Sequence, residues 1–100
     1  MSRYRLEISQ VVRDAIIHLP PQFKRKVKAA LQLLVEDPYQ AKALRDELEG
    51  LRSFRVARSR LILRIKRSTV EVVALGPRKD IYERAAAELS QIIRKGQKAR

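Results

Sequence analysis

The stretch that decides the fold is RSFRVARSRLILRIKRSTVEVVAL, residues 52–75. Its β-branched and aromatic residues are typical of β-strands, and short polar gaps divide it into three runs. The runs cover residues 52–57, 60–66 and 69–75, and the gap Arg67-Ser68 is short enough for a hairpin turn. The sequence therefore predicts three consecutive antiparallel strands.

The register of the first hairpin follows from the alternation of side chains along a strand. The apolar residues share one face in each strand: Phe54 and Val56 in the first, and Leu61, Leu63 and Ile65 in the second. A two-residue loop at Arg58-Ser59 pairs Val56 with Leu61 and turns both apolar rows toward one core. The same register places three arginines on the opposite face, on a concave or open surface: Arg55, Arg60 and Arg64.

The part of the chain before this stretch predicts one strand and a helical hairpin. Residues 4–8 alternate with the period of a strand, and Ser9 is a good N-cap for a helix that ends at Pro20-Pro21. A second helix runs from there to about Glu36, before the break at Asp37-Pro38. Its basic face carries Lys24, Arg25 and Lys28. Such a face is usually solvated, but it can also contact a phosphate backbone.

The end of the chain predicts a helix that follows the last strand. Gly76-Pro77 stops the strand, and Asp80 with Glu83 forms a capping-box pattern for a helix that starts just past Lys79. Arg78 then lies at the edge of the sheet, within one helical turn of Tyr82. We expect a single α+β domain over residues 1–95 and a disordered basic tail over residues 96–100.

Composition narrows the class of protein. Hydrophobic residues make up 45% of the chain, which favours a folded protein, and no apolar run is long enough to cross a membrane. No secretory signal is present, so we expect a soluble, cytoplasmic protein. With no cysteine and one histidine, disulfides and a zinc site are not expected, nor is a cofactor.

The net charge points to a polyanionic partner. The chain has 23 Lys and Arg against 11 Asp and Glu, a net charge of +12. A field of this size concentrates polyanions, and nucleic acid is the first candidate. An acidic protein or an anionic membrane is the alternative.

Three short motifs in this order resemble the RelE/ParE superfamily of bacterial toxins. They are Leu48-x-Gly50, the run Arg55-Val56-Ala57-(x2)-Arg60-Leu61-Ile62, and Gly76-x-Arg78-x-Asp80-Ile81-Tyr82. The resemblance covers nearly the whole chain. It implies a RelE-like fold of N-terminal strand, helical hairpin, one small antiparallel sheet and C-terminal helix, in the toxin of a type II toxin-antitoxin pair. The antitoxin is then the cognate partner, in a possible hetero-oligomer.

The resemblance implies two alternative activities. Toxins similar to RelE enter the ribosome and cut messenger RNA, whereas toxins similar to ParE inhibit DNA gyrase by protein contact. The RelE-like branch is favoured here, with ribosome and mRNA as partners. A homologue that only binds its antitoxin is a third alternative.

The RelE-like pattern also implies the site residues. The basic catalytic positions correspond to Arg55, Arg60 and Arg78, and the family tyrosine corresponds to Tyr82. The first basic position belongs to either Arg52 or Arg55. A guanidinium fork suits the charge of a phosphorane, and a tyrosine can stack on a base or transfer a proton. Further RNA or ribosome contacts are expected from Arg52, Arg58, Arg64, Lys24, Arg25 and Lys28.

Overall fold

The structure, a computed structural model, describes residues 4–98, without the side chains of residues 47, 78–80 and 94–98. The elements in chain order are β1 (Arg5–Ile8), α1 (Gln10–Ile17), α2 (Pro21–Glu36), the 3-10 turn η1 (Pro38–Gln40), β2 (Lys42–Ala43), the 3-10 turn η2 (Asp46–Leu48), β3 (Arg52–Val56), β4 (Ser59–Lys66), β5 (Thr69–Pro77) and α3 (Arg78–Lys98). This order confirms the predicted α+β class.

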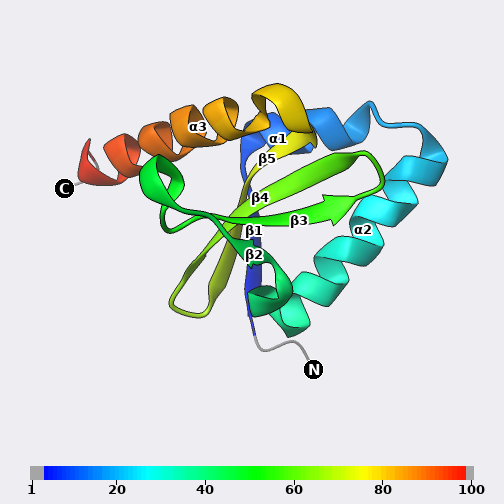
Figure 1. Cartoon of the computed structure of the whole chain (residues 1–100), viewed down its shortest axis with the longest axis horizontal. Helices are drawn as coiled ribbons and strands as arrows, with labels where there is room; N and C mark the ends of the chain where they lie inside the picture. The colour runs from blue at the N-terminus through cyan, green and yellow to red at the C-terminus, as the bar shows by residue number, and fades with distance from the viewer. Residues whose placement is uncertain (1–3, 99–100) are drawn as a thin grey trace.

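The strands form one mixed sheet in the order β1-β5-β4-β3-β2 (Figure 1). The three predicted strands β3, β4 and β5 are antiparallel neighbours, as expected. The strand β1 instead joins the far edge parallel to β5, since the helical hairpin carries the chain back across the sheet before β3 begins. The sequence pattern does not predict β2, whose two residues are too few for a visible alternation.

The first hairpin has a two-residue turn, as predicted, but its strands pair in a different register. Val56 lies opposite Ser59, so the turn is Ala57-Arg58, and the predicted pairing of Val56 with Leu61 is wrong by two residues. The turn starts one residue earlier because Ala57 takes up a left-handed backbone with φ of 56°. Two-residue hairpin turns that match the twist of the strands need such a backbone at their first position. Both apolar rows still face one core.

Helices cover both faces of the sheet (Figure 1). On one face, α1 and α2 bury an apolar core against the strands, built from Val12, Val27, Ala30, Leu31, Leu34, Ala41, Val56, Leu61, Leu63, Val70, Val72 and Leu75. On the other face, α3 buries a second, smaller core, built from Leu51, Ile62, Val73, Ala74, Ile81 and Ala85. A bulge in β5 at Val73 lets two consecutive residues of that strand face α3.

The helix boundaries test the capping predictions. Ser9 caps α1 as expected, because its Oγ accepts a hydrogen bond from the backbone N–H of Val12 at 3.3 Å. The helix α3 begins at Arg78, so Asp80 lies inside the helix and the predicted start past Lys79 is wrong. The same helix continues to Lys98, past the predicted end near Lys95. The division into a domain of residues 1–95 and a tail stays a prediction.

None of the helices within residues 4–98 is both long and apolar enough to span a membrane.

Candidate phosphate-binding site

An arginine-lined pocket lies at the turn between β3 and β4. It has a volume of about 360 Å³ and is lined by Arg55, Arg58, Ser59 and Arg60; we call it the arginine pocket. The ladder of β3 and β4 places Arg55 directly opposite Arg60, and the turn between them carries Arg58. Like charges directly opposite one another destabilise a sheet. The positive charges of these arginines therefore repel one another, and a bound anion would reduce that repulsion.

The guanidiniums of the pocket are only partly engaged by the protein. Arg55 donates through Nε to the backbone oxygen of Ala57 at 3.2 Å, and Arg60 donates through Nη1 to Ser53 Oγ at 3.0 Å. Each guanidinium has five N–H donors in a planar fork that matches phosphate oxygens. Among the side chains that the structure describes, no carboxylate lines the pocket. This arrangement suits a phosphate group.

The other two predicted catalytic residues are placed differently. The side chain of Arg78 lies outside the described residues. Its helix starts directly after Pro77, which pairs with Ser59 of the pocket wall, so the backbone of Arg78 is close to the arginine pocket. Tyr82 is half-buried against the core under α3 and lines a separate pocket of about 330 Å³ together with Arg45, Asp46, Leu48, Glu83 and Ala86. The structure does not bring the Tyr82 ring into the arginine pocket.

Two of the predicted RNA-binding arginines make structural contacts. Arg52 donates through Nη1 to the backbone oxygen of Ala41 at 2.7 Å, and its guanidinium lies 4.8 Å from the ring centroid of Tyr39. The alternation of β3 puts Arg52 on the face of the sheet opposite Arg55. Of the two candidates for the first basic position, Arg55 is therefore the one on the same face as Arg60. Arg64 forms a largely buried ion pair with Glu71. Arg64 thus lies on the predicted face of β4, but the ion pair occupies its guanidinium, and its role in RNA binding stays a prediction.

The basic residues of the second helix lie on the other side of the sheet from Arg55 and Arg60 of the pocket. Lys24, Arg25 and Lys28 lie on α2, which covers the face of the sheet opposite Arg55 and Arg60. Lys24 donates through Nζ to the backbone oxygen of Ile17 at 3.3 Å, and the other two are exposed. These residues form a separate basic surface.

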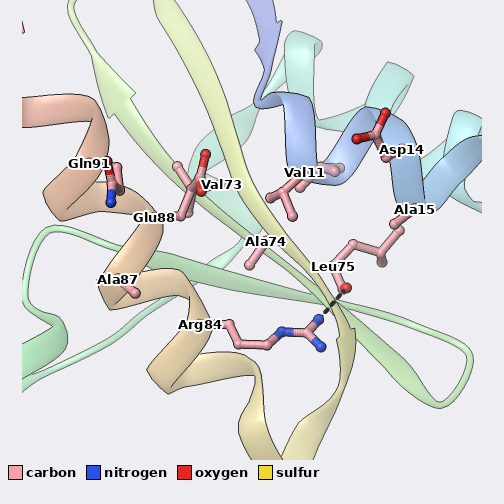
Figure 2. A pocket seen from close by; sticks show the side chains of 11 residues that line it. Val11, Asp14, Ala15, Val73, Ala74, Leu75, Arg84, Ala87, Glu88 and Gln91 are labelled. Atoms are coloured by element: carbon pink, nitrogen blue, oxygen red, sulfur yellow. Dashed lines mark hydrogen bonds between the residues drawn. The ribbon is translucent and has the colours of Figure 1, made fainter. Parts of the chain in front are cut away.

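Sequence reasoning missed Arg84, which lies against the strand that borders the pocket. Arg84 donates through Nη2 to the backbone oxygen of Leu75 at 2.9 Å (Figure 2). A Cβ at the next residue, Gly76, would lie 2.5 Å from that nitrogen, so the glycine makes room for the guanidinium. Gly76 in turn pairs with Arg60. The glycine at the end of a strand was the available signal, but the sequence alone does not say which side chain uses the space.

An apolar groove lies between α1 and α3 above β5, with a volume of about 630 Å³ (Figure 2). Val73, Ala74 and Leu75 form its floor, and Arg84 and Glu88 are among the residues at its α3 side. Within the residues that the structure describes, no cluster of His, Cys, Asp and Glu could hold a metal ion.

These features together define a class: a small basic α+β protein with a mixed sheet, helices on both faces and an arginine-lined pocket at a hairpin turn. Residues 6–82 match the family model of the ParE toxin of the type II toxin-antitoxin system parDE. The match covers most of the chain, and the chain belongs to this family, within the RelE/ParE superfamily of toxins. No curated protein matches the chain.

Solved structures of RelE toxins share the fold. The RelBE2 toxin-antitoxin complex of Mycobacterium tuberculosis has a chain 29% identical, with a TM-score of 0.69 over 76% of this chain and 99% of that one. The RelE–RelB complex of the archaeon Pyrococcus horikoshii gives 22% identity and a TM-score of 0.65, over 77% and 97% of the two chains. Free Escherichia coli RelE, with two arginines replaced by alanine, gives 19% identity and 0.73, over 87% and 97%. The RelE-like fold expected from the motifs is confirmed.

Proposed function

We propose that this toxin is a ribosome-dependent mRNA endoribonuclease whose arginine pocket binds the scissile phosphate. The main support for the proposal is the opposition of Arg55 and Arg60 across β3 and β4, with Arg58 between them and no carboxylate among the described side chains of the pocket lining. The resemblance to RelE toxins supports the choice of messenger RNA as the substrate.

The chemistry of this proposal needs three events at one phosphate. The 2′-hydroxyl loses its proton and its oxygen bonds to phosphorus; the bond from phosphorus to the 5′-oxygen breaks; and the leaving 5′-oxygen gains a proton. The products are a 2′,3′-cyclic phosphate and a 5′-hydroxyl. Charge builds up on the phosphorane between these events, and preorganised guanidiniums stabilise it.

The arginines can stabilise the negative charge of the phosphorane, but they do not carry out the proton transfers. Among the described side chains that line the arginine pocket, none is a carboxylate or an imidazole that could act as general base. The reaction therefore depends on an RNA held in a reactive geometry, where proximity replaces much of the missing acid-base catalysis. Under this proposal the ribosome holds the message in that geometry. Arg78 and Tyr82 stay predicted catalytic residues under this proposal.

The test is cleavage of a message in a translation extract, with the cut sites mapped by primer extension. We expect Arg60→Ala to lower the rate by about two orders of magnitude while the protein stays folded, as for the loss of a contact to transition-state charge. Arg78→Ala should do the same, and Tyr82→Phe should separate a role of the hydroxyl from one of the ring. Lys66→Ala, an exposed cation on the same strand as Arg60, is the matched control. A folded Arg60→Ala variant with full activity would overturn the proposal.

A second candidate function is inhibition of DNA gyrase by protein contact. Two observations favour it: the matching family model is that of ParE, and Tyr82 lines a pocket apart from the arginines. A supercoiling assay with purified gyrase separates the candidates. Inhibition that survives Arg55→Ala and Arg60→Ala, with no cuts in the message, would establish the gyrase function.

We infer that a cognate antitoxin is the natural partner of this chain. The similar Mycobacterium tuberculosis chain was solved in a toxin-antitoxin complex. A net charge of +12 favours an acidic antitoxin segment, which would fold as it wraps the toxin. Copurification of the two proteins from a coexpressed operon tests this inference.

A further inference from the structure

Ser53 is unusual among the residues of the sheet. It lies in β3 between Lys42 of β2 and Ile62 of β4, and only 3% of it is exposed. Among the residues whose burial the structure describes, it is the one polar residue in the buried set. Serine is not among the residues enriched in strands, and it adds little apolar surface to the core. Burial and strand pairing therefore do not explain a serine at this position.

The hydroxyl of Ser53 has a specific partner. Its Oγ accepts a hydrogen bond from Arg60 Nη1 at 3.0 Å, and the bond is partly buried. A buried hydroxyl without a partner is destabilising, so the bond is needed wherever the serine is kept. A bond to a charged group is also stronger than one between neutral groups. Two effects therefore stabilise this hydrogen bond: the burial of the Ser53 hydroxyl and the charge of the Arg60 guanidinium.

This bond gives Arg60 a fixed direction beside a like charge. Arg60 lies directly opposite Arg55, and the two side chains bond in different directions, Arg55 to the backbone of the turn and Arg60 to Ser53 of the neighbouring strand. The contact with Ser53 uses one donor of the Arg60 fork and leaves the others for a ligand. Among the side chains that the structure describes, Arg58 makes no comparable hydrogen bond, and Arg55 donates to the backbone of its own turn.

We propose that Ser53 is a positioning residue that holds the Arg60 guanidinium in the arginine pocket, ready for a phosphate. Its effect on RNA cleavage rests on the proposed function, but its effect on Arg60 does not. A phosphate then binds a guanidinium whose side-chain entropy has already been lost, which raises affinity and favours the reactive geometry.

The first experiment uses the wild-type protein and the arginine side-chain NMR signals. Rotation about the Cζ–Nε bond should be at least several-fold slower for Arg60 than for Arg58, which serves as the internal control. Equal rotation rates for the two arginines would overturn the proposal, and this measurement needs no variant to fold.

The second experiment compares Ser53→Ala with Ser53→Thr, which restores the hydroxyl. In Ser53→Ala we expect faster rotation of Arg60 and an affinity for inorganic phosphate that falls by about three- to tenfold, as for the loss of one hydrogen bond. Ser53→Thr should recover both, and Ser68→Ala, at an exposed turn, is the control. A Ser53→Ala protein with wild-type Arg60 rotation and phosphate affinity would refute the positioning role.

Cleavage assays then separate this inference from the proposed function. In the ribosome-dependent reaction, Ser53→Ala should lower kcat by about three- to tenfold, and Ser53→Thr should recover it. If the wild type does not cut RNA, the proposed function fails while the rotation and phosphate measurements still decide the role of Ser53. If the wild type cuts and Ser53→Ala cuts equally fast with an equally slow Arg60, the inference fails alone.

Discussion

Gly76 and Arg84 make the clearest test at the scale of single residues. The Arg84 guanidinium occupies the space where a Cβ of residue 76 would lie and donates to the backbone oxygen of Leu75. The far end of a flexible side chain can move, so a Gly76→Ala substitution should be tolerated at the cost of that hydrogen bond. We expect Gly76→Ala to lower the free energy of unfolding by about 0.5–1.5 kcal/mol.

A double-mutant cycle measures whether the two residues share this cost. In an Arg84→Ala background, Gly76→Ala should cost clearly less, because the guanidinium that it displaces is gone. Urea denaturation of the four proteins gives the coupling energy. Additive effects would mean that the glycine serves the backbone and not Arg84.

At the scale of elements, the β3–β4 hairpin carries the arginine pocket on a strained turn. Ala57 has a φ of 56°, a region in which a residue with a Cβ costs about 1–2 kcal/mol. Ala57→Gly should therefore raise the free energy of unfolding by about 0.5–1 kcal/mol in urea denaturation. The matched control is Ala29→Gly on the exposed side of α2, which should lower it by about 1 kcal/mol. No gain from Ala57→Gly would show that the turn relaxes the strain elsewhere.

The basic surface of α2 is a second element that can be tested separately from the pocket. Lys24, Arg25 and Lys28 lie on the other side of the sheet, so they can touch ribosomal RNA without taking part in cleavage. Each phosphate contact that is lost reduces the slope of log affinity against log salt by about 0.7–0.9. If all three residues contact phosphate, neutralising them together should flatten the slope for ribosome binding by about 2–3. An unchanged slope would make them an ordinary solvated helix face.

At the scale of the whole molecule, α3 is the element that an antitoxin would most readily displace. It is the helix that follows β5, and it covers one face of the sheet (Figure 1). Ile81 and Ala85 are fully buried, Leu89 and Ile92 are half-buried, and Ile93 is 44% exposed. Local stability should therefore decline from the first turns toward the C-terminus.

Hydrogen exchange on the toxin, alone and bound to its antitoxin, checks this gradient. We expect the amides of residues 89–93 to exchange faster than those of residues 81–85 in the toxin alone. Displacement in the complex would raise exchange throughout α3. If α3 is as protected as β4 in both states, displacement is wrong and the antitoxin must act on another surface, such as the arginine pocket.

Local patterns were sufficient for the class of fold and for most of its elements. The alternation in residues 52–75 predicts β3, β4 and β5, and Ser9 and Asp37-Pro38 mark helix boundaries that the structure confirms. The first helix ends at Ile17, before the predicted end at Pro20-Pro21, and α2 starts at Pro21. These signals act within a few residues, so they can be read without knowing the rest of the fold. The parity of the hairpin also depends on local alternation alone, and it correctly separated Arg55 and Arg60 from the apolar core.

Tertiary contacts decided which charged side chains share a site. The turn lies at Ala57-Arg58 because Ala57 adopts a left-handed backbone, which an alanine in the sequence does not predict. The observed strand register differs from the predicted one by two residues, and it places Arg55 opposite Arg60. Arg64 was removed from the site by Glu71 on the neighbouring strand, and Ser53 was coupled to Arg60 across the sheet. Arginines look alike in a sequence because their charge does not depend on their surroundings. Their roles are set by which carboxylate, hydroxyl or second arginine the fold places within a few ångströms, and that information is non-local.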